Sequence, residues 1–189
     1  MNIGLYFGSF NPIHIGHLII ANHVVNYTDV DQVWLVVSPQ NPLKPSSILL
    51  NEYHRLHLVQ LAVEENPKLR ASDAEFKLPK PSYTIDTLTY LEEKYPKNEF
   101  RIIIGSDSFS NISKWKNSEI LVKNYKLVIY LRPNFPIMGH LPDNIKLLNA
   151  PLLNISATAI RDTIRQNKSV RYLVPGKAYD EIERTGYYK

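Results

Sequence analysis

Short apolar runs alternate along the chain with segments in which apolar residues recur at helical spacing. The runs are rich in β-branched residues and are bounded by turn residues, which is typical of strands buried on both faces of a sheet. The longer runs lie at residues 3–7, 33–37, 100–104 and 127–131, and shorter ones lie at 69–72 and 145–148. We predict a strand at each of them.

The helical segments between these runs follow residues that favour a helix start. We predict a first helix from about Ile15, further helices capped by Asn51, Thr84 and Ser156, and a last short helix from Pro175 toward residue 183. The helix after Asn51 and the helix after Thr84 each place apolar residues at helical spacing. In order along the chain, these residues are Tyr53, Leu56, Val59 and Val63, and then Ile85, Leu88 and Leu91.

The order strand, helix, strand, helix predicts an α/β fold. Parallel strands joined by right-handed crossovers give a Rossmann-like, doubly wound parallel sheet with helices on both faces. We expect one domain over residues 1–189, with a small helical C-terminal extension over about 156–189. In such sheets ligands bind beyond the carboxyl ends of the strands, where the strand order reverses.

Composition narrows the function classes only modestly. The 189 residues include no Cys, which excludes disulfides, thiolate metal sites and a Cys nucleophile. The net charge of +4 suits an anionic ligand, although a basic surface alone explains it as well. No Lys/Arg run or nucleic-acid signature appears, and neither a signal peptide nor a membrane span is evident, so we expect a cytoplasmic protein without nucleic-acid or membrane partners.

The first motif with recognisable chemistry follows the first predicted strand, where residues 8–17 read Gly-Ser-Phe-Asn-Pro-Ile-His-Ile-Gly-His. Gly8 and Ser9 form a turn that lets backbone N–H groups approach a ligand. His14 and His17 share one face of a helix start, where they could donate to phosphate oxygens, and Gly16 leaves room for the phosphates. The alternatives are two surface histidines or a metal pair, but without a nearby carboxylate this would be a poor zinc site.

A second motif lies at the start of a late helix. Ser156 and Thr158 offer hydroxyl groups there, and Arg161 projects about one turn later, which would make a second anion site. An ordinary capped helix with a solvated Arg is the better interpretation of this motif taken alone.

Together the two motifs resemble the signatures of the nucleotidylyltransferase superfamily. Its first signature usually reads Gly-Thr-Phe-Asp-Pro-x-His-x-Gly-His, so Ser9 replaces Thr and Asn11 replaces Asp. The second reads Ser-x-Thr-x-x-Arg and engages the ATP phosphates. The resemblance implies His14, His17 and Arg161 as catalytic residues. It implies an ATP site formed by Gly8, Ser9, Phe10, His14, Gly16, His17, Gly105, Asp107, Arg132, Ser156, Thr158 and Arg161.

Further stretches resemble nicotinate mononucleotide adenylyltransferases. They are residues 81–88, the segment 103–107 with Trp115 after it, and residues 170–175, the last of which we interpret mainly as packing. The resemblance implies that the acceptor nucleotide contacts Tyr83 and Thr84, stacks near Trp115, and places its ribose and phosphate end at Asp107. Lys44 matches a basic position that faces phosphate.

The implied reaction joins ATP and nicotinate mononucleotide to give nicotinate adenine dinucleotide and pyrophosphate, in NAD biosynthesis. We expect direct in-line attack without a covalent intermediate. Mg²⁺ would accompany ATP, held by phosphates and water and not by protein side chains. Whether the chain forms a homo-oligomer is left open.

Several alternatives remain at this level. Phosphopantetheine adenylyltransferases share both ATP motifs, as do cytidylyltransferases, but neither is expected to carry residues 82–84 with the 105–115 segment. Nicotinamide mononucleotide could be the preferred acceptor. A non-catalytic nucleotide sensor is a further option, which both histidines and Arg161 argue against. The chain has neither a Gly-x-Gly-x-x-Gly sequence nor a Walker loop.

Overall fold

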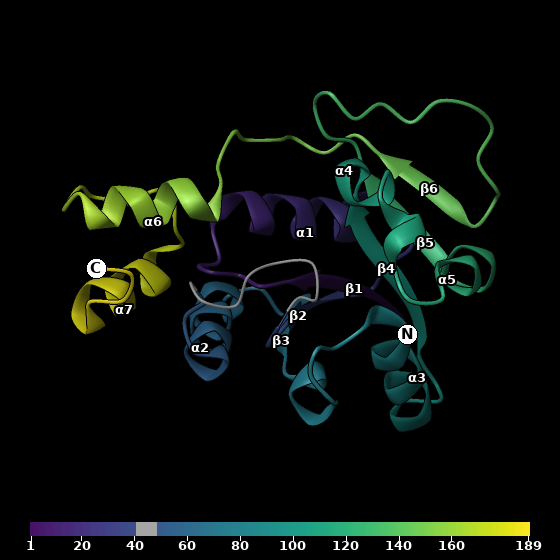
Figure 1. Cartoon of the computed structure of the whole chain (residues 1–189), viewed down its shortest axis with the longest axis horizontal. Coiled ribbons are helices and arrows are strands. Elements are labelled where there is room, and N and C mark those ends of the chain that lie inside the picture. Colours follow the sequence, from purple (N-terminus) through teal and green to yellow (C-terminus); the bar gives the residue numbers. More distant parts are fainter. Residues whose placement is uncertain (41–48) are drawn as a thin grey trace.

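In the computed structural model, which describes residues 1–40 and 49–189, six strands form one sheet (Figure 1). All neighbouring strands pair in parallel. The strands are β1 (Asn2–Gly8), β2 (Gln32–Val37), β3 (Leu69–Ser72), β4 (Glu99–Gly105), β5 (Lys126–Tyr130) and β6 (Ile145–Leu148). Each predicted strand is therefore present, and the predicted α/β class is confirmed.

The strand order is β3-β2-β1-β4-β5-β6. From β1 the chain first winds outward through β2 and β3, and it then crosses back to β4 on the other side of β1. The order therefore reverses between β1 and β4, whose carboxyl ends lie at Gly8 and Gly105. A reversal of this kind leaves a crevice beyond the strand ends, because the two flanking helices cover opposite faces.

Helices connect the strands and follow them. They are α1 (Ile15–Tyr27), α2 (Glu52–Val63), α3 (Thr84–Lys94), α4 (Ser106–Phe109), α5 (Ser118–Asn124), α6 (Ala157–Arg165) and α7 (Gly176–Thr185). Two 3-10 turns are η1 (Ala74–Lys77) and η2 (Ile112–Lys114). The predicted caps Asn51 and Ser156 accept hydrogen bonds from the backbone N–H groups of Tyr53 and Ala159, so both are confirmed.

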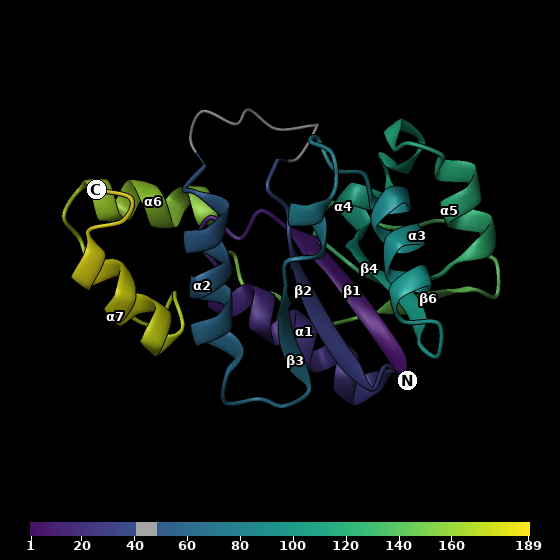
Figure 2. The same ribbon diagram turned by 90° about the horizontal axis from the view of Figure 1, so that it is seen from below.

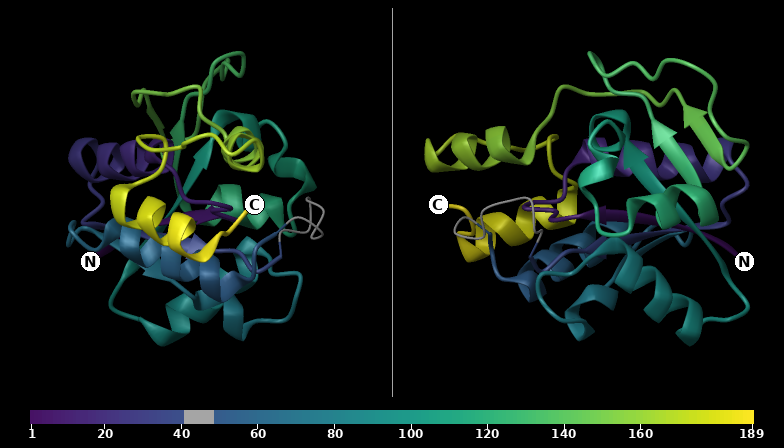
Figure 3. Two further views of the ribbon diagram at one scale, coloured as in Figure 1. Left: turned by 90° about the vertical axis from the view of Figure 1, so that its left-hand side faces the viewer. Right: turned by 45° about the vertical axis from the view of Figure 1, so that its right-hand side comes forward.

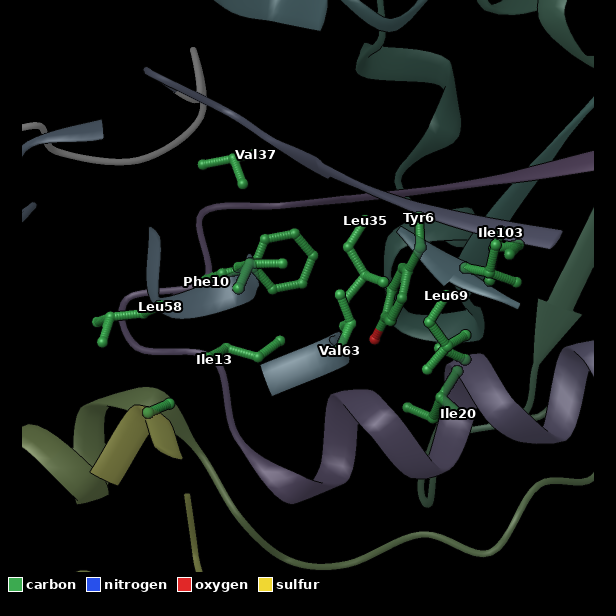
Figure 4. Packing of buried hydrophobic residues seen from close by; sticks show 14 of the residues in the cluster. Tyr6, Phe10, Ile13, Ile20, Leu35, Val37, Leu58, Val63, Leu69 and Ile103 are labelled. Carbon is green, nitrogen blue, oxygen red and sulfur yellow. The ribbon is translucent and has the colours of Figure 1, made fainter. Parts of the chain in front are cut away.

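The core has two layers, one on each face of the sheet. Because side chains alternate along a strand, Tyr6, Leu35 and Ile103 lie side by side on one face, where α1, α2, α6 and α7 complete the cluster (Figure 4). Leu5 and Trp34 lie on the opposite face with α3 and α5. Helices therefore cover both faces, as the sequence predicted.

Two details of the sequence prediction were wrong. Tyr83, not Thr84, is the N-cap of α3, and Thr84 is the first helical residue. Tyr53 was expected on the apolar face of α2, but its side chain is 65% exposed, and Arg55 is fully buried instead. Arg55 is buried because its guanidinium donates to backbone carbonyl groups of other segments. The apolar pattern of a helix does not show such partners.

The helices α6 and α7 lie beyond one end of the sheet, away from α3 and α5 (Figures 1 and 2). Figure 3 shows α7 alongside α2, and these two helices pack together. The C-terminal segment is thereby held against the first half of the chain. No helix in the described part of the chain is long and apolar enough to cross a membrane.

Candidate active site

A pocket of about 720 Å³ lies at the carboxyl ends of β1 and β4, where the strand order reverses. We call it the β1–β4 pocket. It brings together residues that the sequence placed in separate motifs, namely Gly8, Ser9, Tyr83, Thr84, Gly105, Asp107 and Trp115. Its volume lies within the range of small-molecule sites. The tertiary structure thus joins the first motif to the two segments expected at the acceptor nucleotide, residues 81–88 and 103–115.

His14 and His17 form a stacked pair at the start of α1. Their ring centroids are 3.6 Å apart, with an interplanar angle of 24°. His14 is the N-cap of the helix, and its backbone N–H donates to Nδ1 of His17 at 3.2 Å. Because Nδ1 accepts this bond, the proton of the His17 ring lies on Nε2. The local fold therefore fixes the tautomer of His17.

The environment of His14 keeps its ring neutral. Burial, followed by the nearby positive charge of Arg132, lowers the pKa of His14 from 6.5 to about 4. Gly16 has a role in this arrangement, since a Cβ at Gly16 would lie 3.2 Å from the His14 ring. A side chain there would push on the stacked histidines, so Gly16 makes room for His14 itself.

Arg161 joins the second motif to the first. It is buried, and its Nη1 donates to the backbone carbonyl of Asn11 at 2.7 Å while Nη2 donates to Thr158 Oγ1 at 3.2 Å. The Oδ1 atom of Asn11 accepts a bond from the Leu50 N–H at 3.1 Å. Asn11 therefore supplies both contacts through neutral oxygens, and neither requires the carboxylate that the superfamily signature has at this position.

Asp107 and Arg132 lie near each other beside the pocket, with Asp107 Oδ1 3.8 Å from Arg132 Nε. The Arg132 guanidinium also lies over the Tyr130 ring, 5.1 Å from its centroid. A Cβ at Gly105 would lie 2.3 Å from Asp107 Oδ1, so only glycine permits this position of the carboxylate. The carboxylate and the guanidinium are placed where ribose hydroxyl and phosphate groups could bind.

Several buried polar atoms around these residues have no hydrogen-bond partner in the described part of the chain. They are Ser9 Oγ, Asp107 Oδ1, Arg132 Nε and Arg161 Nε. Buried polar groups normally have partners, and unpaired ones are costly. Ser9 and Asp107 follow β1 and β4, Arg132 follows β5, and Arg161 lies in α6. Unpaired atoms from these four elements indicate a site that is completed by a polar ligand.

The other side of the pocket is formed by the start of α3 and the segment around η2. Tyr83 has extended backbone and makes no side-chain cap, which leaves first-turn N–H groups of α3 for a ligand. Trp115 packs partly against the second core layer and lines the pocket. Lys116 Nζ lies 5.0 Å from the Tyr83 ring centroid and pairs with Asp86. An aromatic and cationic wall of this kind suits a flat anionic ring.

Not all predicted site residues line the pocket. Phe10 is buried, and its ring lies 5.0 Å from the His17 ring and packs on Gly8, where a Cβ would be 2.9 Å away. The remaining predicted residues lie outside the pocket lining, namely His14, Gly16, His17, Arg132, Ser156, Thr158 and Arg161. Lys44 falls outside the described residues. The roles of all these residues stay predictions.

Sequence reasoning missed Arg55, whose side chain is 0% exposed. It donates to the carbonyls of Ser9 (2.5 Å), Ser38 (2.7 Å) and Pro39 (3.1 Å), which ties the ends of β1 and β2 together below the first motif. The sequence carries no signal for its burial, because a charged residue of a helix is normally assigned to the solvent-facing side.

Glu75 was also missed, and it lies in the pocket wall. Its side chain is 2% exposed and accepts hydrogen bonds from three hydroxyl groups. Burial raises the pKa of its carboxyl group, although the hydroxyl donors oppose this shift. No periodic pattern marks this residue, because η1 is a single short turn.

Comparison with known proteins agrees with this geometry. A family model described as cytidylyltransferase-like matches residues 5–163. The site and fold thus define a nucleotidyltransferase, and the chain belongs to the cytidylyltransferase-like family.

Curated relatives narrow the family further. Proteins of Cytophaga hutchinsonii and Flavobacterium psychrophilum, both named "Probable nicotinate-nucleotide adenylyltransferase", are 52% and 48% identical to this chain. The alignments cover 100% of this chain, with 98% and 100% of the respective relatives. Within the cytidylyltransferase-like family, the chain therefore belongs to the nicotinate-nucleotide adenylyltransferases.

Solved structures show the same fold. The Plasmodium falciparum nicotinic acid mononucleotide adenylyltransferase complexed with NaAD superposes with a TM-score of 0.81 over 99% of this chain and 97% of that chain. The sequences are 22% identical, so this likeness concerns the fold.

Proposed function

We propose that this chain transfers the adenylyl group of ATP to nicotinate mononucleotide, giving nicotinate adenine dinucleotide and pyrophosphate as a step of NAD biosynthesis. The observation that carries the proposal is the β1–β4 pocket. Its lining combines Gly8 and Ser9, at the end of β1, with Tyr83, Thr84 and Trp115. A donor nucleotide and a flat acceptor could therefore lie in one cavity with their phosphates between them.

The physical demands of the reaction match the groups that the chain supplies. The phosphate of a mononucleotide is already a nucleophile at neutral pH, so no general base is needed. The barrier comes from bringing two polyanions together and from stabilising the pyrophosphate as it leaves. Fixed donors and cations lower such a barrier, and the chain concentrates them around the start of α1.

We assign the transition-state contacts to His17 and Arg161, and a positioning role to His14. The N–H group at Nε2 of His17 donates to the triphosphate near the α-phosphorus, and the neutral His14 ring holds His17 in place by stacking. Arg161, fixed through the Asn11 carbonyl, neutralises the charge that develops on the leaving pyrophosphate. The acceptor phosphate attacks in line, the α–β phosphoanhydride bond breaks, and no covalent enzyme intermediate forms.

The acceptor ring would lie against Trp115, with its carboxylate received by first-turn N–H groups of α3. A helix N-terminus favours an anion through its unpaired N–H groups. Lys116 lies on the same wall and pairs there with Asp86. These features favour the nicotinate carboxylate over the neutral amide of nicotinamide mononucleotide.

Mg²⁺ would enter with ATP. Within the described residues, no group of three or more His, Asp or Glu side chains could hold a metal ion. We expect Mg²⁺ to be held by triphosphate oxygens and water, with cationic side chains of the protein around the phosphates. When bound, the ion would neutralise part of the triphosphate charge.

The test is a pyrophosphate-release assay with ATP and Mg²⁺. Nicotinate mononucleotide, nicotinamide mononucleotide and phosphopantetheine are compared as acceptors under identical conditions. We expect the highest kcat/KM with nicotinate mononucleotide and formation of nicotinate adenine dinucleotide, identified by mass. Activity with phosphopantetheine alone would overturn the proposal, and a preference for the nicotinamide form would overturn its acceptor assignment.

A further inference from the structure

Glu75 lies at the meeting point of three segments that form one wall of the β1–β4 pocket. Its Oε2 accepts hydrogen bonds from the hydroxyl groups of Ser38 and Ser82, each at 2.5 Å. Its Oε1 accepts from Thr87 Oγ1 at 3.2 Å. Ser38 follows β2, Ser82 immediately precedes Tyr83, and Thr87 lies in the first turn of α3. One carboxyl group therefore connects all three segments.

A carboxyl group in this position carries a large desolvation cost. Glu75 is 2% exposed and forms no ion pair within the described part of the chain. A buried acid without a cation is stabilised only by hydrogen bonds to it, and the three hydroxyl donors supply them. An apolar side chain would fill the same space without this cost. The presence of a carboxyl group at position 75 therefore indicates a role beyond packing.

The hydrogen bonds of Glu75 lead directly to the Tyr83–Thr84 segment, which is expected to contact the acceptor. The Thr87 hydroxyl also lies 3.2 Å from the backbone carbonyl of Tyr83, the N-cap of α3, so its single proton is shared between Glu75 and this carbonyl. Ser82 is covalently joined to Tyr83 on the other side. Glu75, Ser38 and Ser82 themselves line the pocket. Tyr83 and Thr84 are thus held from both sides by groups that bond to one carboxyl.

We propose that Glu75 is a positioning residue for the acceptor nucleotide. This inference rests on the proposed function and deepens it. Glu75 fixes the Tyr83–Thr84 segment so that the first-turn N–H groups of α3 face the bound ring. Of its three hydrogen-bond partners, Ser82 and Thr87 flank the Tyr83–Thr84 segment, so the acceptor half of the site depends on Glu75 most directly. Loss of the network misplaces the acceptor far more than it disturbs ATP.

The decisive variant is Glu75→Gln, which keeps the size of the side chain but replaces one acceptor oxygen with a donor. At least one hydroxyl then loses its acceptor. We expect the KM for nicotinate mononucleotide to rise about tenfold, because a charge-assisted hydrogen bond is lost. The KM for ATP should change much less, because Glu75 reaches the end of β1 only indirectly, through Ser38.

A matched pair of variants guards against a general effect on folding. Thr87→Val removes one donor to Glu75 without a change of shape, and Thr89→Val makes the same exchange at an exposed position of α3 whose hydroxyl bonds to the Ile85 carbonyl. We expect Thr87→Val to raise the acceptor KM and Thr89→Val to leave it unchanged. If Glu75→Gln fails to fold, this pair still decides the question.

The outcomes separate the two proposals. A wild-type chain that releases no pyrophosphate with nicotinate mononucleotide overturns the proposed function, and the Glu75 role with it. An active wild type whose Glu75→Gln and Thr87→Val variants keep the normal acceptor KM overturns the Glu75 role alone. An equal rise of both KM values would also overturn it, because it would mean a loosened fold and not a misplaced acceptor segment.

Discussion

The guanidinium of Arg161 donates to the backbone carbonyl of Asn11 at 2.7 Å, across 150 positions of sequence. This bond fixes the second motif against the first, since α6 contributes the cation and the loop before α1 contributes the acceptor. The planar guanidinium also binds Thr158, so its orientation is set by two contacts. Because the orientation is fixed before ATP binds, reorienting the guanidinium adds no free-energy cost during catalysis.

Arg161→Lys tests that geometry. Lysine keeps the positive charge but lacks the fork that contacts Asn11 and Thr158 together. We expect kcat to fall by about tenfold or more, on the order of 1.4 kcal/mol in transition-state stabilisation. Arg165→Lys on the same helix is the control, because Arg165 is exposed and pairs with Asp162. Equal kinetics for the two variants would contradict the role of Arg161.

His17→Ala removes the ring whose proton lies on Nε2. We expect turnover to fall by orders of magnitude, on the scale of a lost transition-state donor, about 100-fold or more. The melting temperature should change little. His23→Ala, in the same helix with its ring stacked on Tyr27, serves as the control. Near-normal turnover of the folded His17 variant would show that this histidine makes no transition-state contact.

Trp115→Ala removes the aromatic surface proposed for the acceptor ring. Stacking on an aromatic side chain is worth about 1–3 kcal/mol per base, so the KM for nicotinate mononucleotide should rise at least several-fold. Steady-state kinetics with each substrate varied in turn will separate the two sites. A variant that changed only the KM for ATP would contradict the proposal, because it would place Trp115 at the ATP site and not at the acceptor site.

The lowered pKa of His14 predicts how the free energy of unfolding depends on pH. Its pKa is about 4 in the folded chain and 6.5 when it is unconstrained, so below pH 6.5 the unfolded chain binds a proton that the folded chain does not. The stabilisation is complete above pH 6.5 and is lost as the pH falls toward 4. The loss is on the order of 3 kcal/mol. Chemical denaturation at pH 7.5 and 4.5 measures it.

The control for this measurement is His14→Gln, whose side chain does not titrate. Its free energy of unfolding should fall less between the two pH values than that of the wild type. If both proteins lose the same amount, the acid sensitivity arises from other groups.

Much of the fold was predictable because it depends on local periodicity. A strand buried on both faces and an amphipathic helix each leave a repeating pattern in the sequence, and Asn51 and Ser156 are caps whose oxygens bond to N–H groups only two or three residues away. The cap of α3 was misplaced by one residue, at Thr84 instead of Tyr83, because that helix starts without any side-chain cap.

The first motif, residues 8–17, likewise contains features that the sequence predicts and contacts that it does not. The sequence by itself determined that His14 and His17 share a helix start, since their spacing fixes this. Only the tertiary structure decided that Gly16 accommodates the His14 ring and that Asn11 receives Arg161. Neither contact follows from spacing, because Arg161 comes from a distant helix and the His14 ring folds back over its own turn.

The buried charges were the residues least accessible to sequence reasoning. Arg55 and Glu75 look like surface residues of a helix and a turn, yet both are buried at the site. Their burial is tolerable only because Ser9, Ser38 and Ser82 supply backbone or hydroxyl partners from other segments. The sequence determined the elements and the motifs, since these depend on neighbours along the chain. The tertiary structure decided which charges are buried, because their partners meet only when the sheet assembles.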